Sequence, residues 1–241
     1  MRIVTRKRVR PKHRPIRPSA TARAFRSRLL AWYARHRRTL PWRGVGDPYA
    51  VLVSEIMLQQ TQVARVLDYY PRFLARYPTL EDLAAAPADA VRESWAGLGY
   101  YARARNLHAA ARQVVAGDGA LPRDPAMLRG LPGIGRYTAG AVASLAFGAD
   151  VAAVDTNAAR VIARVLGVGG RGGAGARLAR VWRHAEALVP AGRSAVWNQA
   201  LMDLGATICT ARAPRCPACP VRRVCRASGA TRARPGRDTR R

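Results

Sequence analysis

Residues 131–157, LPGIGRYTAGAVASLAFGADVAAVDTN, are the stretch that most constrains the fold of this chain. The opening LPGIG predicts a tight turn, because Gly133 and Gly135 can adopt positive φ angles without a Cβ clash. A helix beginning near Arg136 would add unpaired backbone N–H donors and the positive end of its dipole. Such a turn can hold a phosphate with backbone groups alone, although an ordinary helix–helix turn would have the same pattern.

A single carboxylate, Asp155, follows this turn after the short apolar run at residues 151–154. It is expected at the start of another helix, where Asp is a common N-cap. A phosphate-binding turn followed by a placed carboxylate also suggests chemistry on a nucleic acid. From the local pattern, both roles of Asp155 remain open.

The charge of the chain favours a polyanionic partner. Its 241 residues include 42 Lys and Arg against 14 Asp and Glu, which gives a formal net charge of +28. Nucleic acid is the first candidate for such a partner. We expect residues 1–20 to form a disordered basic tail and residues 227–241 a second basic tail. A non-catalytic binder would have the same charge, so charge alone does not decide between binding and catalysis.

The hydrophobic pattern predicts an all-α fold, with no convincing strand. Apolar residues recur at helical spacing in several segments, namely 21–38, 49–70, 88–96, 102–117, 156–167, 177–188 and 194–208. In the long helix expected at 49–70, Glu55 lies among apolar neighbours. The length allows one domain or two small ones.

The sequence shows no secretory signal and no apolar run long enough to cross a membrane. Its cysteines are clustered rather than spread as a disulfide framework. We therefore expect a cytoplasmic monomer without a membrane partner, associated with the nucleoid if the protein is bacterial.

The cysteine cluster predicts a metal centre. All the cysteines of the chain lie in one C-x6-C-x2-C-x5-C segment, formed by Cys209, Cys216, Cys219 and Cys225. Four thiolates in so short a segment can enclose one centre. Zinc sites more often pair two C-x2-C units, and only one is present here, so the spacing favours a [4Fe–4S] cluster over zinc. Arginines in the same loop suggest that the cluster holds a DNA-binding loop.

Together these motifs resemble the helix–hairpin–helix iron–sulfur DNA glycosylases, most closely the A/G-specific adenine glycosylases of the MutY type. The matching segments are LPWRGVGDPYAVLVSEIMLQQTQV, GLGYYARARNLH, LPGIGRYTAG, VDTNAARV, WNQALMDLGATIC and the cysteine loop. The resemblance implies two helical lobes with the active-site cleft between them. One lobe would comprise residues 21–46 and 156–226, with the cluster loop at 209–225. The other, a six-helix barrel, would comprise residues 47–155, with the helix–hairpin–helix at 128–148.

The resemblance also implies roles for individual residues. Glu55 would be the catalytic acid and Asp155 the carboxylate facing the developing sugar cation, while Tyr137 stands where related lyases keep a lysine. The residues around the flipped adenine would be Trp42, Arg43, Leu58, Gln60 and Gln199. Tyr100 or Tyr101 would be the wedge that enters the base stack, and the other DNA contacts would come from Gln59, Leu131, Gly133, Ile134, Gly135 and Arg136.

The implied reaction is removal of adenine opposite guanine or 8-oxoguanine in double-stranded DNA, after the base has been flipped out. Adenine leaves readily only when protonated, and burial would raise the pKa of Glu55 enough for it to donate near pH 7. Ionised Asp155 would then stabilise the oxocarbenium-like sugar. A β-lyase needs an amine nucleophile, and residues 13–241 contain no lysine, so we expect a monofunctional enzyme.

Two features depart from this family. The chain ends at Arg241, shortly after Cys225, so we expect the C-terminal domain that helps the family recognise 8-oxoguanine to be absent. The family often has DGN where this chain has Asp155, Thr156 and Asn157. A thymine/uracil glycosylase of the same superfamily, acting on T or U opposite G, is therefore an alternative, and a non-catalytic DNA-binding module is another.

Overall fold

The computed structural model describes residues 19–169 and 172–230, and this part of the chain is helical without a strand. The all-α prediction is therefore confirmed. The predicted tails lie outside the described residues, apart from residues 19–20 and 227–230. None of the described helices combines the length and hydrophobicity needed to cross a membrane.

The helices follow one another through short connections. The first half contains α1 (Ala20–His36), α2 (Pro48–Met57), α3 (Val63–Arg76), α4 (Leu80–Ala85), α5 (Ala88–Ser94) and α6 (Ala102–Ala116). The second half contains α7 (Pro125–Leu128), α8 (Arg136–Leu145), α9 (Thr156–Leu166), α10 (Ala174–Leu188), α11 (Ser194–Thr207), the 3-10 turns η1 (Cys216–Ala218) and η2 (Arg222–Val224), and α12 (Arg226–Ala230).

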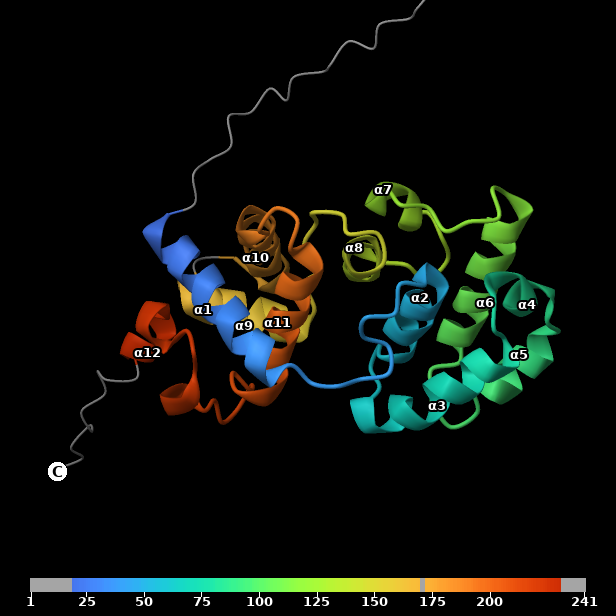
Figure 1. The fold of residues 1–241 in the computed structure, drawn as a ribbon, viewed down its shortest axis with the longest axis horizontal. Helices are drawn as coiled ribbons and strands as arrows, with labels where there is room; N and C mark the ends of the chain where they lie inside the picture. Colours follow the sequence, from blue (N-terminus) through green and yellow to red (C-terminus); the bar gives the residue numbers. More distant parts are fainter. Residues whose placement is uncertain (1–18, 170–171, 231–241) are drawn as a thin grey trace, which may run out of the picture.

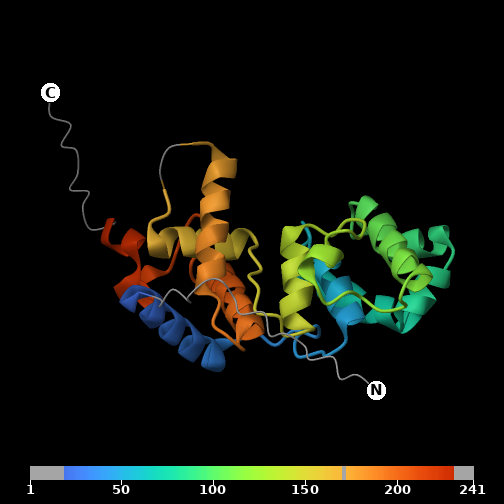
Figure 2. The same cartoon turned by 90° about the horizontal axis from the view of Figure 1, so that it is seen from above.

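Two hydrophobic clusters hold these helices together. Helices α2–α8 share the first cluster, and α1 joins α9, α10 and α11 in the second, so the two ends of the described chain pack side by side. Figures 1 and 2 show the two groups of helices next to each other, with α8 at the boundary. Trp42 packs in the first cluster and Val154 in the second. The predicted lobe boundaries at residues 46 and 155 stay a prediction.

The prediction of a single long helix at residues 49–70 is wrong. Helix α2 ends at Met57, α3 begins at Val63, and Gln60 between them has a φ angle of 56°. The carbonyls at the end of α2 accept hydrogen bonds from the Arg103 side chain rather than from a continuing helix. The apolar stripe cannot reveal this break, because the group that caps α2 lies 46 residues further along the chain.

A close backbone contact positions the segment before Asp155. A Cβ on Gly140 of α8 would lie 2.3 Å from the Ala152 carbonyl oxygen. The buried Asn198 side chain of α11 accepts a bond from the Ala153 N–H at 3.2 Å and donates to Ser144 Oγ at 2.9 Å. The segment leading to Asp155 is thus held between α8 and α11.

We predict that Gly140→Ala will destabilise the protein by about 1–3 kcal/mol, because the added methyl group must push two backbones apart. Gly175→Ala in α10 is the matched control, since a Cβ there meets nothing within 4 Å. Alanine is also the better helix former, so this control should be neutral or slightly stabilising. Denaturant unfolding of both variants checks the prediction, and equal midpoints would contradict it.

Candidate active site

A cavity of about 760 Å³ lies where the two hydrophobic clusters meet. Its walls come from the residue 38–43 segment, the end of α2, the turn at residues 58–62, α8, the start of α9 and α11. The cavity brings together the residues predicted as catalytic or adenine-binding, together with Gln59: Glu55, Tyr137, Asp155, Trp42, Arg43, Leu58, Gln60 and Gln199.

Glu55 is a buried carboxyl group in the last turn of α2, with 4% of its surface exposed. Its Oε2 accepts a 2.7 Å hydrogen bond from the Tyr137 hydroxyl. Burial is the largest cause that raises the pKa of Glu55 to about 7; the charge of Asp155 adds to it, while the Tyr137 hydrogen bond and Arg43 oppose it. Near neutral pH, Glu55 can therefore exist in its protonated form.

Tyr137 is the second residue of α8, and its side chain reaches Glu55. Burial raises the pKa of the Tyr137 phenol well above its ordinary value, and the carboxylates of Glu55 and Asp155 raise it further. The phenol consequently stays protonated, and its hydroxyl donates the hydrogen bond to Glu55. Its oxygen also lies 3.9 Å from the Met202 sulfur of α11.

Asp155 is the N-cap of α9 and also faces the cavity. Its Oδ1 accepts the Ala158 N–H at 2.6 Å, and its Oδ2 accepts from Asn157 Nδ2 at 2.9 Å. Asn157 in turn accepts from Arg160 Nη2 at 2.7 Å, and Arg160 Nε donates to the Cys209 carbonyl at 2.7 Å. Asp155 can therefore cap α9 and still present its carboxylate to the cavity, so the two roles that the sequence left open are compatible.

Two further wall residues are held by partners that sequence reasoning missed. The Arg43 guanidinium donates two parallel 2.7 Å hydrogen bonds to the buried Asp203 carboxylate, which also binds Arg38. Although burial would raise the pKa of Asp203, these arginines hold it below its ordinary value. Gln199 Oε1 accepts from the Tyr33 hydroxyl at 2.7 Å. No local pattern marks Asp203 or Tyr33, because the bonded partners are 160 and 166 residues apart in the chain.

The hairpin between α7 and α8 differs in part from the prediction. Gly133 has a φ angle of 75°, as expected, whereas Gly135 is extended with a φ angle of −83° and caps α8. Both glycines are exposed, and within the described residues neither amide donates a backbone hydrogen bond. Leu131 and Ile134 are buried in the first cluster, so their side chains support the turn from inside and do not face outward.

Three further predicted DNA contacts, Arg136, Tyr100 and Tyr101, lie outside the cavity. Arg136 stacks on Trp182 at 4.0 Å and donates a 2.5 Å bond to Glu186, so its side chain lies along α10 rather than on the hairpin. Tyr100 and Tyr101 are exposed at the start of α6, and Tyr100 has a φ angle of 49°. The hairpin lies against this same helix, since a Cβ on Gly133 would meet the α6 residue Asn106 at 2.6 Å. The hairpin and the two tyrosines are thus both associated with α6, and neither lines the cavity.

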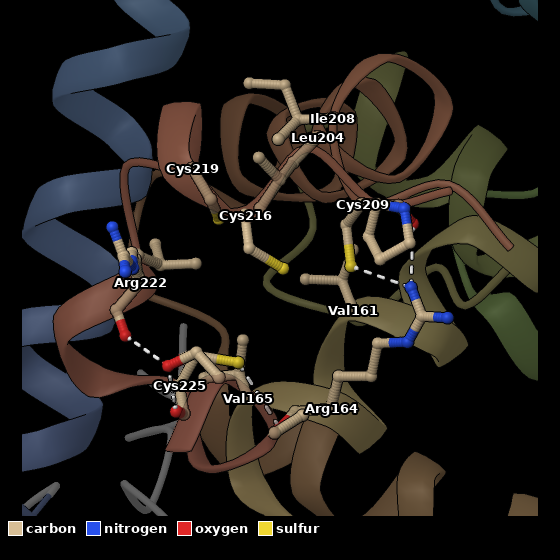
Figure 3. A pocket seen from close by; sticks show the side chains of 14 residues that line it. Val161, Arg164, Val165, Leu204, Ile208, Cys209, Cys216, Cys219, Arg222 and Cys225 are labelled. Atoms are coloured by element: carbon tan, nitrogen blue, oxygen red, sulfur yellow. Dashed lines mark hydrogen bonds between the residues drawn. The ribbon is translucent and has the colours of Figure 1, made fainter. Parts of the chain in front are cut away.

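The four cysteines surround a second cavity, of about 170 Å³ (Figure 3). All four are free thiols, and the cavity lies between α9, the end of α11 and the turns η1 and η2. Among the described residues, no three His, Cys, Asp or Glu side chains are grouped as they would be around a single ion. Arg164 Nη1 donates to Cys209 Sγ at 3.4 Å. A four-sulfur donor set around a cavity suits a multi-iron cluster better than one zinc ion.

The sequence of this chain matches a protein-family model. The model of the HhH-GPD superfamily base excision DNA repair protein matches residues 53–184. The chain belongs to this superfamily. The predicted relationship to helix–hairpin–helix glycosylases is therefore confirmed, and the match covers Glu55, Tyr137 and Asp155.

Individual relatives extend the similarity to most of the chain. The adenine DNA glycosylase of Homo sapiens is 47% identical over 221 residues, which cover 88% of this chain but 40% of the human protein. A thermostable thymine-DNA glycosylase structure matches with a TM-score of 0.79 and 35% identity, covering 87% of this chain and 97% of that one. An endonuclease III–DNA complex matches with a TM-score of 0.74 and 25% identity, over 88% and 97% of the two chains.

Because the pKa of Glu55 is raised, we predict that the stability of the folded protein depends on pH. Its pKa is about 7 in the folded protein, against an ordinary value of 4.5 in an unfolded chain. Between these values the folded protein keeps a proton that the unfolded chain has released, so the free energy of unfolding falls as the pH rises from 4.5 to 7. Glu55→Gln removes this titration. Its free energy of unfolding, relative to that of the wild type, should therefore increase by a few kcal/mol between pH 4.5 and 7.

Urea unfolding of wild type and Glu55→Gln at successive pH values measures this gain. Glu81→Gln, at an exposed position in α4, is the matched control and should follow the wild type at every pH. A constant difference between wild type and Glu55→Gln would mean that the Glu55 pKa is not raised.

Proposed function

We propose that this chain is a monofunctional DNA glycosylase that removes adenine mispaired with guanine or 8-oxoguanine and leaves an abasic site. One observation carries the proposal: a carboxyl group with a pKa near 7, Glu55, shares a cavity with a second carboxylate, Asp155. A volume of about 760 Å³ lies within the range of small-molecule sites, which suits a flipped nucleotide. The chain spans about 40% of the human adenine glycosylase, so its activity and substrate are proposed rather than taken from that protein.

The proposed reaction uses each carboxyl group once. Protonated Glu55 donates its proton to a ring nitrogen of the flipped adenine, so the base leaves with the electron pair of the glycosidic bond. Asp155 stabilises the positive charge that develops on the sugar. Water then adds to the anomeric carbon, and its released proton restores Glu55. Tyr137 orients the acid through its hydrogen bond and is a phenol, so no Schiff base forms there.

Double-stranded DNA is the proposed partner of the monomeric protein, which would act in the cytoplasm, at the nucleoid if bacterial. The free amides of Gly133 and Gly135 suit a phosphate, and Tyr100 or Tyr101 would enter the base stack. Similarity to an endonuclease III–DNA complex supports this partner. The match to a thymine-DNA glycosylase supports T or U opposite G as the second candidate substrate, although identity to the adenine enzyme is higher.

We also propose that Cys209, Cys216, Cys219 and Cys225 hold a [4Fe–4S] cluster. The cluster would connect α9 and the end of α11 to the last turns of the described chain. Its contribution there is structural, since it would hold the arginine-bearing loop in shape. The donor set fits this group, with four thiols at one cavity and an arginine hydrogen bond to one sulfur.

A base-release panel tests the proposed reaction. Duplexes carry A opposite 8-oxoguanine, A opposite G, T or U opposite G, and hypoxanthine, each assayed with and without alkali. We expect adenine release, with strand breaks appearing only after alkali. Glu55→Gln should abolish release but keep duplex binding, whereas Glu81→Gln should retain both. Release of T or U but not A would replace the substrate assignment, and strand cleavage without alkali would contradict the monofunctional one.

Metal analysis tests the proposed cluster. The purified protein should contain iron and acid-labile sulfide in equal amounts, and Cys216→Ser should lose both together with thermal stability. Ala218→Ser in the same turn is the matched control, because it adds a hydroxyl group without removing a thiol. Bound zinc without sulfide would overturn the cluster assignment.

A further inference from the structure

Arg103, the second residue of α6, makes an unusual set of contacts. Only 8% of its surface is exposed, yet no carboxylate contacts it among the described residues. Its Nη1 donates to the carbonyls of Ile56 at 3.0 Å, Met57 at 2.8 Å and Gln59. Its Nη2 donates to three more acceptors: Thr61 Oγ1 at 2.9 Å, the Gly99 carbonyl at 3.1 Å and the Leu98 carbonyl at 3.2 Å.

Ile56 and Met57 are the last two residues of α2, and the other four acceptors belong to two loops that are far apart in sequence. The first is the turn after α2, residues 58–62, which contributes Gln59 and Gln60 to the cavity wall. The second is the turn before α6, residues 98–101, which presents Tyr100 with 61% of its surface exposed. The Arg103 guanidinium also lies 5.6 Å from the centroid of the Tyr100 ring. One cation therefore contacts both the backbone and a side chain of these turns.

Each loop also contains a strained residue. Gln60 and Tyr100 are the non-glycine residues with positive φ in the part of the chain that the structure describes. Residues other than glycine adopt this conformation at a cost, and it persists only when surrounding contacts hold it. The carbonyls of Gln59 and Gly99, which Arg103 binds, directly precede Gln60 and Tyr100. Arg103 thus binds the carbonyl group directly before each of the two residues with positive φ.

We propose that Arg103 is a positioning residue that holds the cavity loop and the Tyr100 turn as one unit. The role of each loop on DNA rests on the proposed function, whereas the coupling of the loops does not. A planar guanidinium can donate in several directions, but a lysine ammonium at this place has three donors on one atom and cannot reach all six acceptors. Lysine should therefore keep the charge and lose the coupling.

Hydrogen exchange on the free, full-length protein tests the coupling directly. Arg103→Lys should speed amide exchange in residues 58–62 and 98–101 together, by about tenfold or more, because both turns lose contacts that hold them. Val114→Ala, a buried position further along α6, is the matched control. It should lower the melting temperature without speeding exchange in the two turns.

DNA-based readouts then separate positioning from stability. A duplex with 2-aminopurine beside an A opposite G mismatch brightens when the neighbouring base unstacks. With Arg103→Lys this signal and the single-turnover rate of adenine release should each fall at least about tenfold, since small misplacements cost rate steeply. Val114→Ala should retain both at a temperature where it is folded.

The outcomes distinguish this inference from the proposed function. If the wild type unstacks the base but releases no adenine, the proposed function fails while the exchange result still decides the role of Arg103. If Arg103→Lys loosens neither turn, or one turn alone, the inference is overturned. Should Arg103→Lys not fold, Thr61→Val removes one of the six acceptors and should speed exchange in both turns by a few-fold; an effect on residues 58–62 alone would equally overturn it.

Discussion

The hydrogen bond between Glu55 and Tyr137 is the interaction on which the site depends. A carboxyl group buried to this extent is unstable as an anion unless it is paired, so it either finds a donor or takes up a proton. Tyr137 supplies one neutral donor, which opposes the effect of burial on the Glu55 pKa without cancelling it, so Glu55 can still hold a proton near neutral pH. The bond also joins α2 to α8, and α8 packs directly against the segment leading to Asp155, since a Cβ on Gly140 would lie 2.3 Å from the Ala152 carbonyl oxygen. The positions of both carboxyl groups thus follow from one packing arrangement.

Backbone carbonyl groups explain why the molecule needs Arg103. The last carbonyls of a helix have no partner within it, and here those of α2 end at the wall of a cavity next to Glu55. Capping by water would open the helix end to solvent and reduce the desolvation that raises the Glu55 pKa. The Arg103 guanidinium donates to these carbonyls and is itself buried, with 8% of the residue's surface exposed. The end of α2 that Arg103 caps is thus the same helical turn that carries the buried Glu55 carboxyl group.

The features that the sequence predicts well are those governed by neighbouring residues. The turn at Gly133, the N-cap at Asp155 and the free thiols spaced through the cysteine loop depend on residues within a few positions of each other. The break in the 49–70 helix, the pairing of Arg43 with Asp203 and the direction of the Arg136 side chain depend on distant partners. Hydrophobic periodicity carries no information about such partners. Only the family resemblance predicts the residues of the cavity, because no periodicity joins Trp42 to Gln199.

The placement of arginine explains how a very basic chain can keep a carboxylic acid protonated. A free cation beside Glu55 would lower its pKa and ionise it, yet the chain has a net charge of +28. Arg43, on the same cavity wall, is held by both oxygens of Asp203, and Arg43 is the weakest of the causes acting on the Glu55 pKa. Pairing Arg43 internally therefore separates two requirements that conflict. The surface can stay cationic enough to attract a polyanion, while the cavity stays neutral enough for an acid with a pKa of about 7.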